Sequence, residues 1–232
     1  MGVSVRDRGA CAEIVLDRPP ANAFDIETVQ ELISAVQGIE PGRPIILTGA
    51  GGIFSAGVDT KAFAGYAPAE KAEMVRAITR MTACLLNHSG PLLTAVDGHA
   101  LGGGFVLALC GDYRLATQRE TAKYGLTEAK AGIPFPAGPA EIIRYELPAS
   151  FLRRLTLTSE VVGIDEMLMA GTFDRAVPRD ELLARAAEIA ETMASQPGFA
   201  MVKRQVRGAL ADHLSALAAS GEDPLADQLL KG

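Results

Sequence analysis

A glycine-rich turn between two apolar runs offers the clearest chemistry in this chain. Residues 92–104 are LLTAVDGHALGGG, and the apolar residues 105–110 follow at once. The pattern predicts a buried strand, a tight turn and the start of a helix. Glycine lets other groups approach the backbone, and the first turn of a helix has unpaired N–H groups and the positive end of the dipole. We therefore predict that the turn binds negative charge, either on a phosphate or on an oxygen that becomes anionic during a reaction.

A second segment with a central glycine, residues 54–59 (FSAGVD), follows the predicted strand 44–48. If both strands are parallel, the two segments lie side by side at one sheet edge, where their N–H groups can form an oxyanion hole. Such a hole needs a proton carrier, and Glu128 is a candidate in the stiff, largely apolar loop around YGLTE (124–128). Partial burial would raise its pKa toward the range of a general base. The spacing alone fits an exposed glutamate equally well.

The glycines do not fit the known nucleotide-binding motifs. A dinucleotide fingerprint needs a glycine where Phe54 stands, and a phosphate loop needs a lysine where Phe105 stands. No Tyr-x-x-x-Lys pair and no Gly-x-Ser-x-Gly motif occurs. The histidines, His88, His99 and His213, are too scattered for a triad or a metal site. We expect no metal, and we expect a structural role for His99 although it lies in the glycine turn.

Composition excludes several classes of partner. The net charge of −6 over 232 residues argues against general nucleic-acid binding. No apolar run reaches the roughly 18 residues of a membrane span, and the first residues lack the apolar core of a signal peptide. The chain has three cysteines, Cys11, Cys84 and Cys110, and each lies among apolar residues in the sequence. An odd number in apolar surroundings indicates reduced, buried thiols. We expect a cytoplasmic protein with no nucleic-acid or membrane partner.

The remaining elements predict one α/β domain with a helical C-terminal portion. We expect strands at 11–17, 44–48, 92–97 and 112–116. Asp25 should cap a helix ending near residue 40, and Pro68 should begin a helix ending near residue 87. Residues 123–138 should be mostly loop. Further helices are expected at 139–145, 149–157, 164–170, 180–195 with Asp180 as its cap, and 199–219.

Several segments in register resemble the enoyl-CoA hydratase/isomerase (crotonase) family. They are residues 18–24 (RPPANAF), 54–59, 95–104, 112–116 (DYRLA) and 124–128 with 132–134 (GIP), over roughly residues 10–210. The resemblance implies an α/β fold of the crotonase type, a spiral of strand-strand-helix units. It implies acyl-CoA thioester substrates and no separate cofactor, because coenzyme A enters with the substrate. It also implies a core over 1–180, a helical oligomerisation segment over 181–232, and a homotrimer or hexamer.

The resemblance also implies roles for individual residues. Val58 and Gly103 would supply the backbone N–H groups to the thioester oxygen, and Glu128 would fall on a catalytic glutamate of the family. Ala56 and its neighbours would line the path of adenine and pantetheine. The substrate-binding residues would be Ala23, Ala56, Gly57, Asp59, Leu101, Gly102 and Thr127.

The chain departs from the family's hydratases at Val106, where they carry a second glutamate two residues after the triple glycine. Hydration uses two carboxylates to orient and activate water, whereas shifting a C3 double bond to C2 needs one acid/base. The pattern is therefore closest to Δ3-Δ2 enoyl-CoA isomerases, with Glu128 as the single acid/base. Enoyl-CoA hydration, another chemistry of the family and non-catalytic thioester binding remain alternatives. A replacement acid would have to come from carboxylates that we expect to be exposed or ion-paired: Asp97, Asp112, Glu141 or Glu146.

Overall fold

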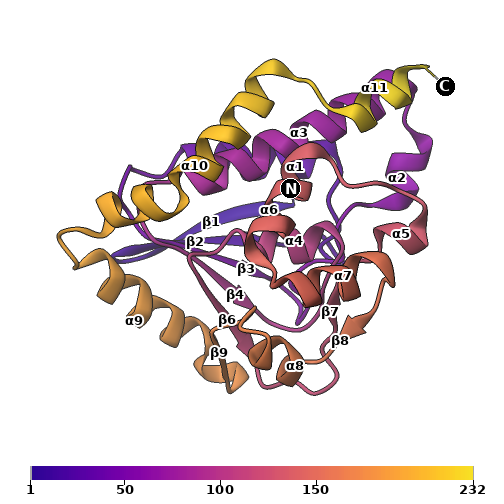
Figure 1. Cartoon of the computed structure of the whole chain (residues 1–232). Coiled ribbons are helices and arrows are strands. Elements are labelled where there is room, and N and C mark those ends of the chain that lie inside the picture. The colour runs from indigo at the N-terminus through magenta and orange to yellow at the C-terminus, as the bar shows by residue number, and fades with distance from the viewer. Residues whose placement is uncertain (1, 232) are drawn as a thin grey trace.

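The computed structural model describes residues 2–231 and contains one large and one small sheet (Figure 1). The large sheet has the order β1-β2-β3-β4-β6-β9, with β1 antiparallel to β2 and every other pairing parallel. The small sheet has the order β5-β7-β8. The strands are β1 (Val3–Arg8), β2 (Cys11–Leu16), β3 (Ile45–Gly49), β4 (Leu92–Val96), β5 (Ala100–Leu101), β6 (Tyr113–Thr117), β7 (Tyr124–Gly125), β8 (Val161–Val162) and β9 (Arg175–Val177).

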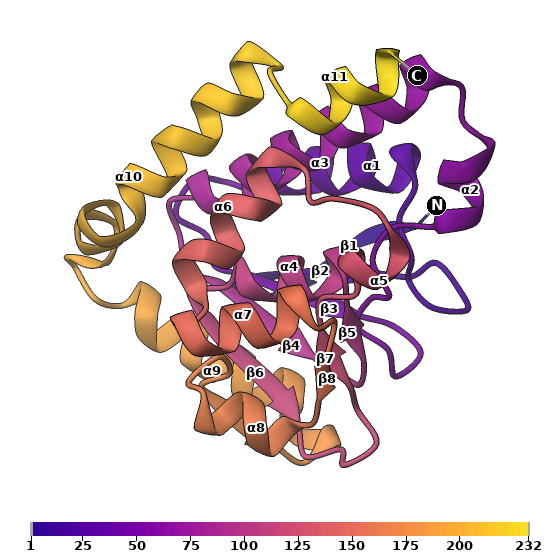
Figure 2. The ribbon, with the colours of Figure 1, turned by 45° about the vertical axis from the view of Figure 1, so that its right-hand side comes forward.

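Helices cover both faces of the large sheet. One face packs against α9 through a small apolar cluster, and the other carries the main core with α1, α3, α4 and α6. Figure 2 shows α10 lying along α3, with α11 beyond it. The helices are α1 (Ile26–Gln37), α2 (Thr60–Gly65), α3 (Pro68–Asn87), α4 (Gly103–Leu109), α5 (Glu128–Ala131), α6 (Ala137–Glu146), α7 (Ala149–Leu157), α8 (Ile164–Met169), α9 (Leu182–Ala194), α10 (Phe199–Ser220) and α11 (Pro224–Lys231).

The predicted helix starts at Asp25 and Pro68 are confirmed. Asp25 accepts a hydrogen bond of 2.9 Å from the Thr28 N–H, which satisfies one unpaired donor of the first turn. Proline is tolerated at the first position of α3 because its missing N–H would have no helical partner. The first helix ends earlier than predicted, because Gly38 caps it at Gln37 with its N–H bonded to the Ser34 carbonyl.

Other boundaries and short elements differ from the predictions. Asp180 does not cap the following helix, because a 3-10 turn occupies Arg179–Glu181 and α9 begins at Leu182. The segment 123–138, predicted as mostly loop, contains β7 and α5. Strands β1, β5, β8 and β9 and helices α2 and α11 were not predicted. The edge strand β1 is largely exposed, and β7, β8 and α5 have two to four residues, so tertiary pairing rather than periodicity determines them.

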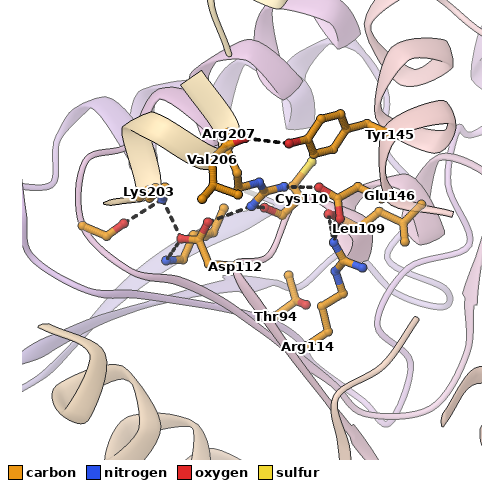
Figure 3. A network of polar contacts seen from close by, with 12 residues as sticks. Thr94, Leu109, Cys110, Asp112, Arg114, Tyr145, Glu146, Lys203, Val206 and Arg207 are labelled. Carbon is orange, nitrogen blue, oxygen red and sulfur yellow. Dashed lines mark hydrogen bonds and ion pairs between the residues drawn. The ribbon is translucent and has the colours of Figure 1, made fainter. Parts of the chain in front are cut away.

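A buried network of charges fixes α10 to the core (Figure 3). Asp112 accepts hydrogen bonds from Lys203 at 2.6 Å and Arg207 at 2.7 Å. Arg207 also donates to Glu146 at 2.6 Å, and Glu146 pairs with Arg114. The five side chains are at most 12% exposed. Because an unpaired buried charge is strongly unfavourable, these residues must stay together, and α10 is held in one position.

None of the helices within residues 2–231 combines the length and the apolar character needed to cross a membrane.

Candidate active site

The two glycine-containing segments lie side by side beyond the carboxyl ends of β3 and β4, as predicted. Ser55 and Ala100 form a parallel bridge between the segments. The Leu101 N–H donates to the Ser55 carbonyl at 3.0 Å, and the Ser55 N–H donates to the His99 carbonyl at 3.2 Å. The 98–104 segment therefore runs as a neighbouring strand of the 54–59 segment before α4 begins.

Two glycines allow this close approach. Gly57 has φ of +84°, and a Cβ on it would lie 2.8 Å from the Gly103 nitrogen and 2.9 Å from the Leu101 carbonyl oxygen. Gly102 has φ of +54°, and a Cβ there would lie 3.2 Å from Glu128 Oε1. Any side chain at Gly57 would push the segments apart, because real Cβ atoms do not approach backbone so closely. The Glu128 carboxylate therefore lies beside the turn that leads into Gly103.

The amides of Val58 and Gly103 are both free to bind a ligand. Phe24 bridges Val58 by donating to the Gly57 carbonyl and accepting from the Asp59 N–H, each at 2.9 Å. The Val58 N–H thus faces away from Phe24, as the middle residue of a parallel bridge does. Gly103 is the first residue of α4, where a helix has no internal acceptor for the N–H. Within residues 2–231 neither amide has a protein acceptor, and both residues line one cavity.

Glu128 lies in the wall of the same cavity with an unsatisfied carboxylate. It is the first residue of α5, and its Oε2 is shielded from solvent without a hydrogen-bond partner in the described chain. Burial raises the pKa of this carboxyl from 4.5 to about 7, although nearby backbone N–H groups of Glu128 and Thr127 favour the charged form. A pKa close to neutral suits a group that must both take and return a proton.

The rest of the cavity wall is almost entirely apolar. Val106, 1% exposed, lines it from α4. Among the lining residues of the described chain, Glu128 has the only ionisable side chain. Six of the predicted site residues belong to the lining: Glu128, Val58, Gly103, Ala56, Gly102 and Thr127.

The other four predicted site residues surround the cavity without lining it. Asp59 caps α2 by accepting from Lys61 and Ala62 N–H groups at 3.1 Å. The backbone bond from Ala62 and the pairing with Arg18 lower the pKa of Asp59. Ala23 accepts a bond from Arg18 through its carbonyl. Gly57 lacks the Cβ that would separate the paired segments, and Leu101 joins them by donating its N–H to the Ser55 carbonyl. That these four bind substrate stays a prediction.

No substitute acid reaches the cavity from the four carboxylates considered above. Asp97 pairs with Arg179 at 2.8 Å, and Glu141 pairs with Arg144 on its own helix. Asp112 and Glu146 belong to the buried network beneath α10. None of the four is a lining residue, so the expectation that they are ion-paired is confirmed. His99 accepts a bond from the Lys123 N–H through Nδ1 and lies outside the cavity wall.

Sequence reasoning missed most of the apolar wall. Val75 and Ile78 of α3 belong to a helical stripe that predicts core packing but not which cavity it borders. Phe135 lies in the segment predicted as loop. Leu225 lies on α11, an eight-residue helix that was not predicted although Pro224 and the spacing of its apolar residues could have indicated it.

Comparisons with known proteins agree with this geometry. A family model described as enoyl-CoA hydratase/isomerase matches residues 6–225. The carnitinyl-CoA dehydratase of Escherichia coli (strain K12) is 34% identical over 198 residues, 83% of this chain and 74% of that protein. The structure of an enoyl-CoA hydratase from Bacillus anthracis superimposes with a TM-score of 0.82 and 28% identity, covering 95% of this chain and 90% of the other.

Two structures of one and the same Mycobacterium tuberculosis protein are each 25% identical to this chain, with TM-scores of 0.85. One is described as a probable enoyl-CoA hydratase and covers 94% of both chains. The other is described as an enoyl-CoA isomerase and covers 95% of this chain and 97% of its own. These likenesses confirm the predicted fold, a crotonase-like spiral with a helical C-terminal portion.

Proposed function

The chain belongs to the enoyl-CoA hydratase/isomerase family, and from that premise we propose that it moves a C3 double bond of an enoyl-CoA to C2, with Glu128 as its single acid/base. One observation carries the proposal. Glu128 is the only ionisable side chain in the described lining of a cavity that also contains two unpaired amides, and the position two residues past Gly104 is Val106.

The proposed reaction needs one base and one oxyanion site. With the thioester oxygen held by the Val58 and Gly103 N–H groups, the Glu128 carboxylate removes a proton from C2. The electrons of that C–H bond form the C1=C2 bond of a dienolate, whose negative oxygen the two amides stabilise. The protonated Glu128 then delivers the proton to C4, where the C3=C4 π electrons form the new C–H bond. The C1=C2 electrons of the dienolate move to form C2=C3, and the oxygen re-forms the thioester carbonyl. The carboxylate is regenerated, and no water or external acid is consumed.

Enoyl-CoA hydration is the second candidate, because relatives of this chain are described as a dehydratase and hydratases. Adding water across C2=C3 requires a group that activates the water and a group that gives a proton to C2. One carboxylate can do both in turn, but it does so without a second carboxylate to orient the water. Since general acid–base groups each contribute about 10²–10⁴ in rate, we expect hydration here to be slow.

The proposal predicts that turnover of 3-enoyl-CoA exceeds hydration of 2-enoyl-CoA. Measured on matched hexenoyl-CoA isomers by chromatography of the products, kcat/KM for isomerisation should be about 10²-fold higher, the lower bound for one missing acid–base group. A faster hydration of 2-hexenoyl-CoA would replace the isomerase assignment with a hydratase. Tight binding of both thioesters without turnover would indicate a non-catalytic binder.

We also propose that α10 forms the contact surface of a homotrimer. Met201, Val202 and Val206 on this helix are 69%, 55% and 62% exposed. Large apolar side chains grouped on one helix commonly mark an interface between copies. Light scattering after size-exclusion chromatography should give a mass of three chains, or six if two trimers associate. A monomer at micromolar concentration would contradict the proposal, and Val206→Asp should lower the mass if this face is the contact.

A further inference from the structure

The cavity has an open end and a closed end, which differ in burial. The exposed lining residues Ala56, Thr60, Ala131 and Pro134 border solvent and form the open end. At the other end Val75 and Ile78 of α3 are 2% and 5% exposed, and Leu225 of α11 is 9% exposed. Because the charged part of coenzyme A must stay near solvent, the acyl chain points from the Gly103 amide and Glu128 toward the closed end.

Helix α11 closes that end without belonging to the main core. Leu225 and Ala226 pack with Ala72 and Val75 in a separate small apolar cluster, to which Leu229 adds a partly buried side chain. The helix therefore rests on α3 as an addition to the fold. A substitution in this cluster can change the cavity while the sheet and the Glu128 loop keep their packing.

A buried carboxylate holds the start of α11 in place. Asp223 is 2% exposed, and its Oδ1 accepts from the Leu225 N–H at 2.9 Å. Its Oδ2 accepts from the Ala137 N–H at 2.7 Å, at the first residue of α6. Arg76 of α3 adds a bond of 2.9 Å to the Gly221 carbonyl. The segment that begins α11 is thus tied to α6 through Asp223 and to α3 through Gly221, which gives the Leu225 side chain a fixed place in the cavity.

From this arrangement we propose that Leu225 sets the longest acyl chain that the cavity accepts, and that the substrates are thioesters of uncharged hydrocarbon chains. No ionisable residue of the described lining lies at the closed end, so a charged acyl group would lose its hydration without a partner. Each methylene that fits is buried against apolar side chains, which favours binding. A chain that reaches Leu225 can extend no further while α11 stays in place. The inference rests on the proposed acyl-CoA function of the same cavity.

The test uses saturated acyl-CoA thioesters, which bind but cannot isomerise. Calorimetric Kd values for butyryl-, hexanoyl-, octanoyl- and decanoyl-CoA should decrease with length up to a limit in the unaltered protein. Leu225→Ala should tighten binding of the first excluded chain about tenfold, as expected for roughly two more buried methylenes. Leu225→Phe should shift the limit toward a shorter chain and serves as a second variant if the alanine variant melts early.

Leu229→Ala is the matched control, because Leu229 lies on the same helix and in the same cluster but does not line the cavity. It should leave the length limit unchanged while loosening α11 in a similar way. An unchanged limit in both Leu225 variants, or an equal shift in Leu229→Ala, would overturn the role of Leu225. If the unaltered protein binds none of the four thioesters, the proposed acyl-CoA function itself fails.

Discussion

Replacement of Glu128 by glutamine is expected to lower kcat for 3-enoyl-CoA isomerisation by about 10²–10⁴, the usual contribution of a general acid–base group. Glutamine has nearly the same shape, so the cavity and the Gly102 turn against which Oε1 lies should keep their geometry. It cannot accept the C2 proton, and its amide cannot return one to C4. The affinity for a saturated acyl-CoA should therefore change little while turnover is lost.

Glu141→Gln provides the matched control for this substitution. Glu141 lies on α6 in a surface ion pair with Arg144 and outside the cavity lining. Steady-state rates should be measured for both variants, and melting temperatures should show that both fold. The comparison distinguishes the loss of the catalytic base from a general effect of removing one carboxylate. Full activity in Glu128→Gln, or an equal loss in Glu141→Gln, would contradict the role of Glu128 as the acid/base.

The pH dependence should report the same group. Burial raises the pKa of Glu128 to about 7, and a base is active only when it is deprotonated. Activity should therefore be full above this pH and fall about tenfold for each unit below it, because the charged fraction falls in that proportion. The midpoint of the pH profile of kcat/KM reports the pKa of Glu128 in the free enzyme. A profile that stays flat down to pH 5 would show that Glu128 does not limit the reaction.

The strand-turn-helix at the centre of the site was predictable because its signals are local. Glycines at 98 and 102–104 follow an apolar run, and each of these features acts within a few residues of chain. Asp25 and Pro68 are likewise local signals for helix starts, and both are confirmed. The departure at Val106 was visible as a residue type, and its place in the cavity wall agrees with that interpretation.

What the sequence could not supply depends on contacts between distant segments. That the two glycine segments lie side by side was predicted, but the close contact of Gly57 with the Gly103 nitrogen was not, because it depends on backbone conformation in both segments. The Glu128 carboxylate borders a cavity whose apolar wall comes from α3, α4 and the loop after α5, segments that are distant in sequence, so its raised pKa could only be a hypothesis. The place of Leu225 follows from the bond of Asp223 to the Ala137 N–H of α6, 86 positions away, and from the bond of Arg76 on α3 to the Gly221 carbonyl. The sequence alone does not tell whether a carboxylate pairs with an arginine in the fold, as Glu146 does, or borders an apolar cavity, as Glu128 does.

Gly103→Pro should lower isomerisation by about 10²–10³, because it removes one of the two N–H donors to the dienolate oxygen. Proline suits the first position of a helix, where the N–H has no helical partner, so α4 should still form. The substitution also adds a Cβ, which would lie 2.8 Å from Phe24 Cζ and must displace that ring. The steric effect therefore has to be measured separately.

Gly103→Ala makes that separation, since it adds the same Cβ and keeps the N–H. Both variants should show a similar change in melting temperature, because both must move the Phe24 ring. The proline variant should in addition bind a saturated acyl-CoA more weakly, because its Cδ replaces the N–H that donates to the thioester oxygen. Only the proline variant should lose the further factor of about 10²–10³ in kcat that one oxyanion donor contributes. Equal kcat values in the two variants would mean that the Gly103 N–H does not hold the reacting oxygen. The unpaired Val58 and Gly103 amides would then need another role in the cavity.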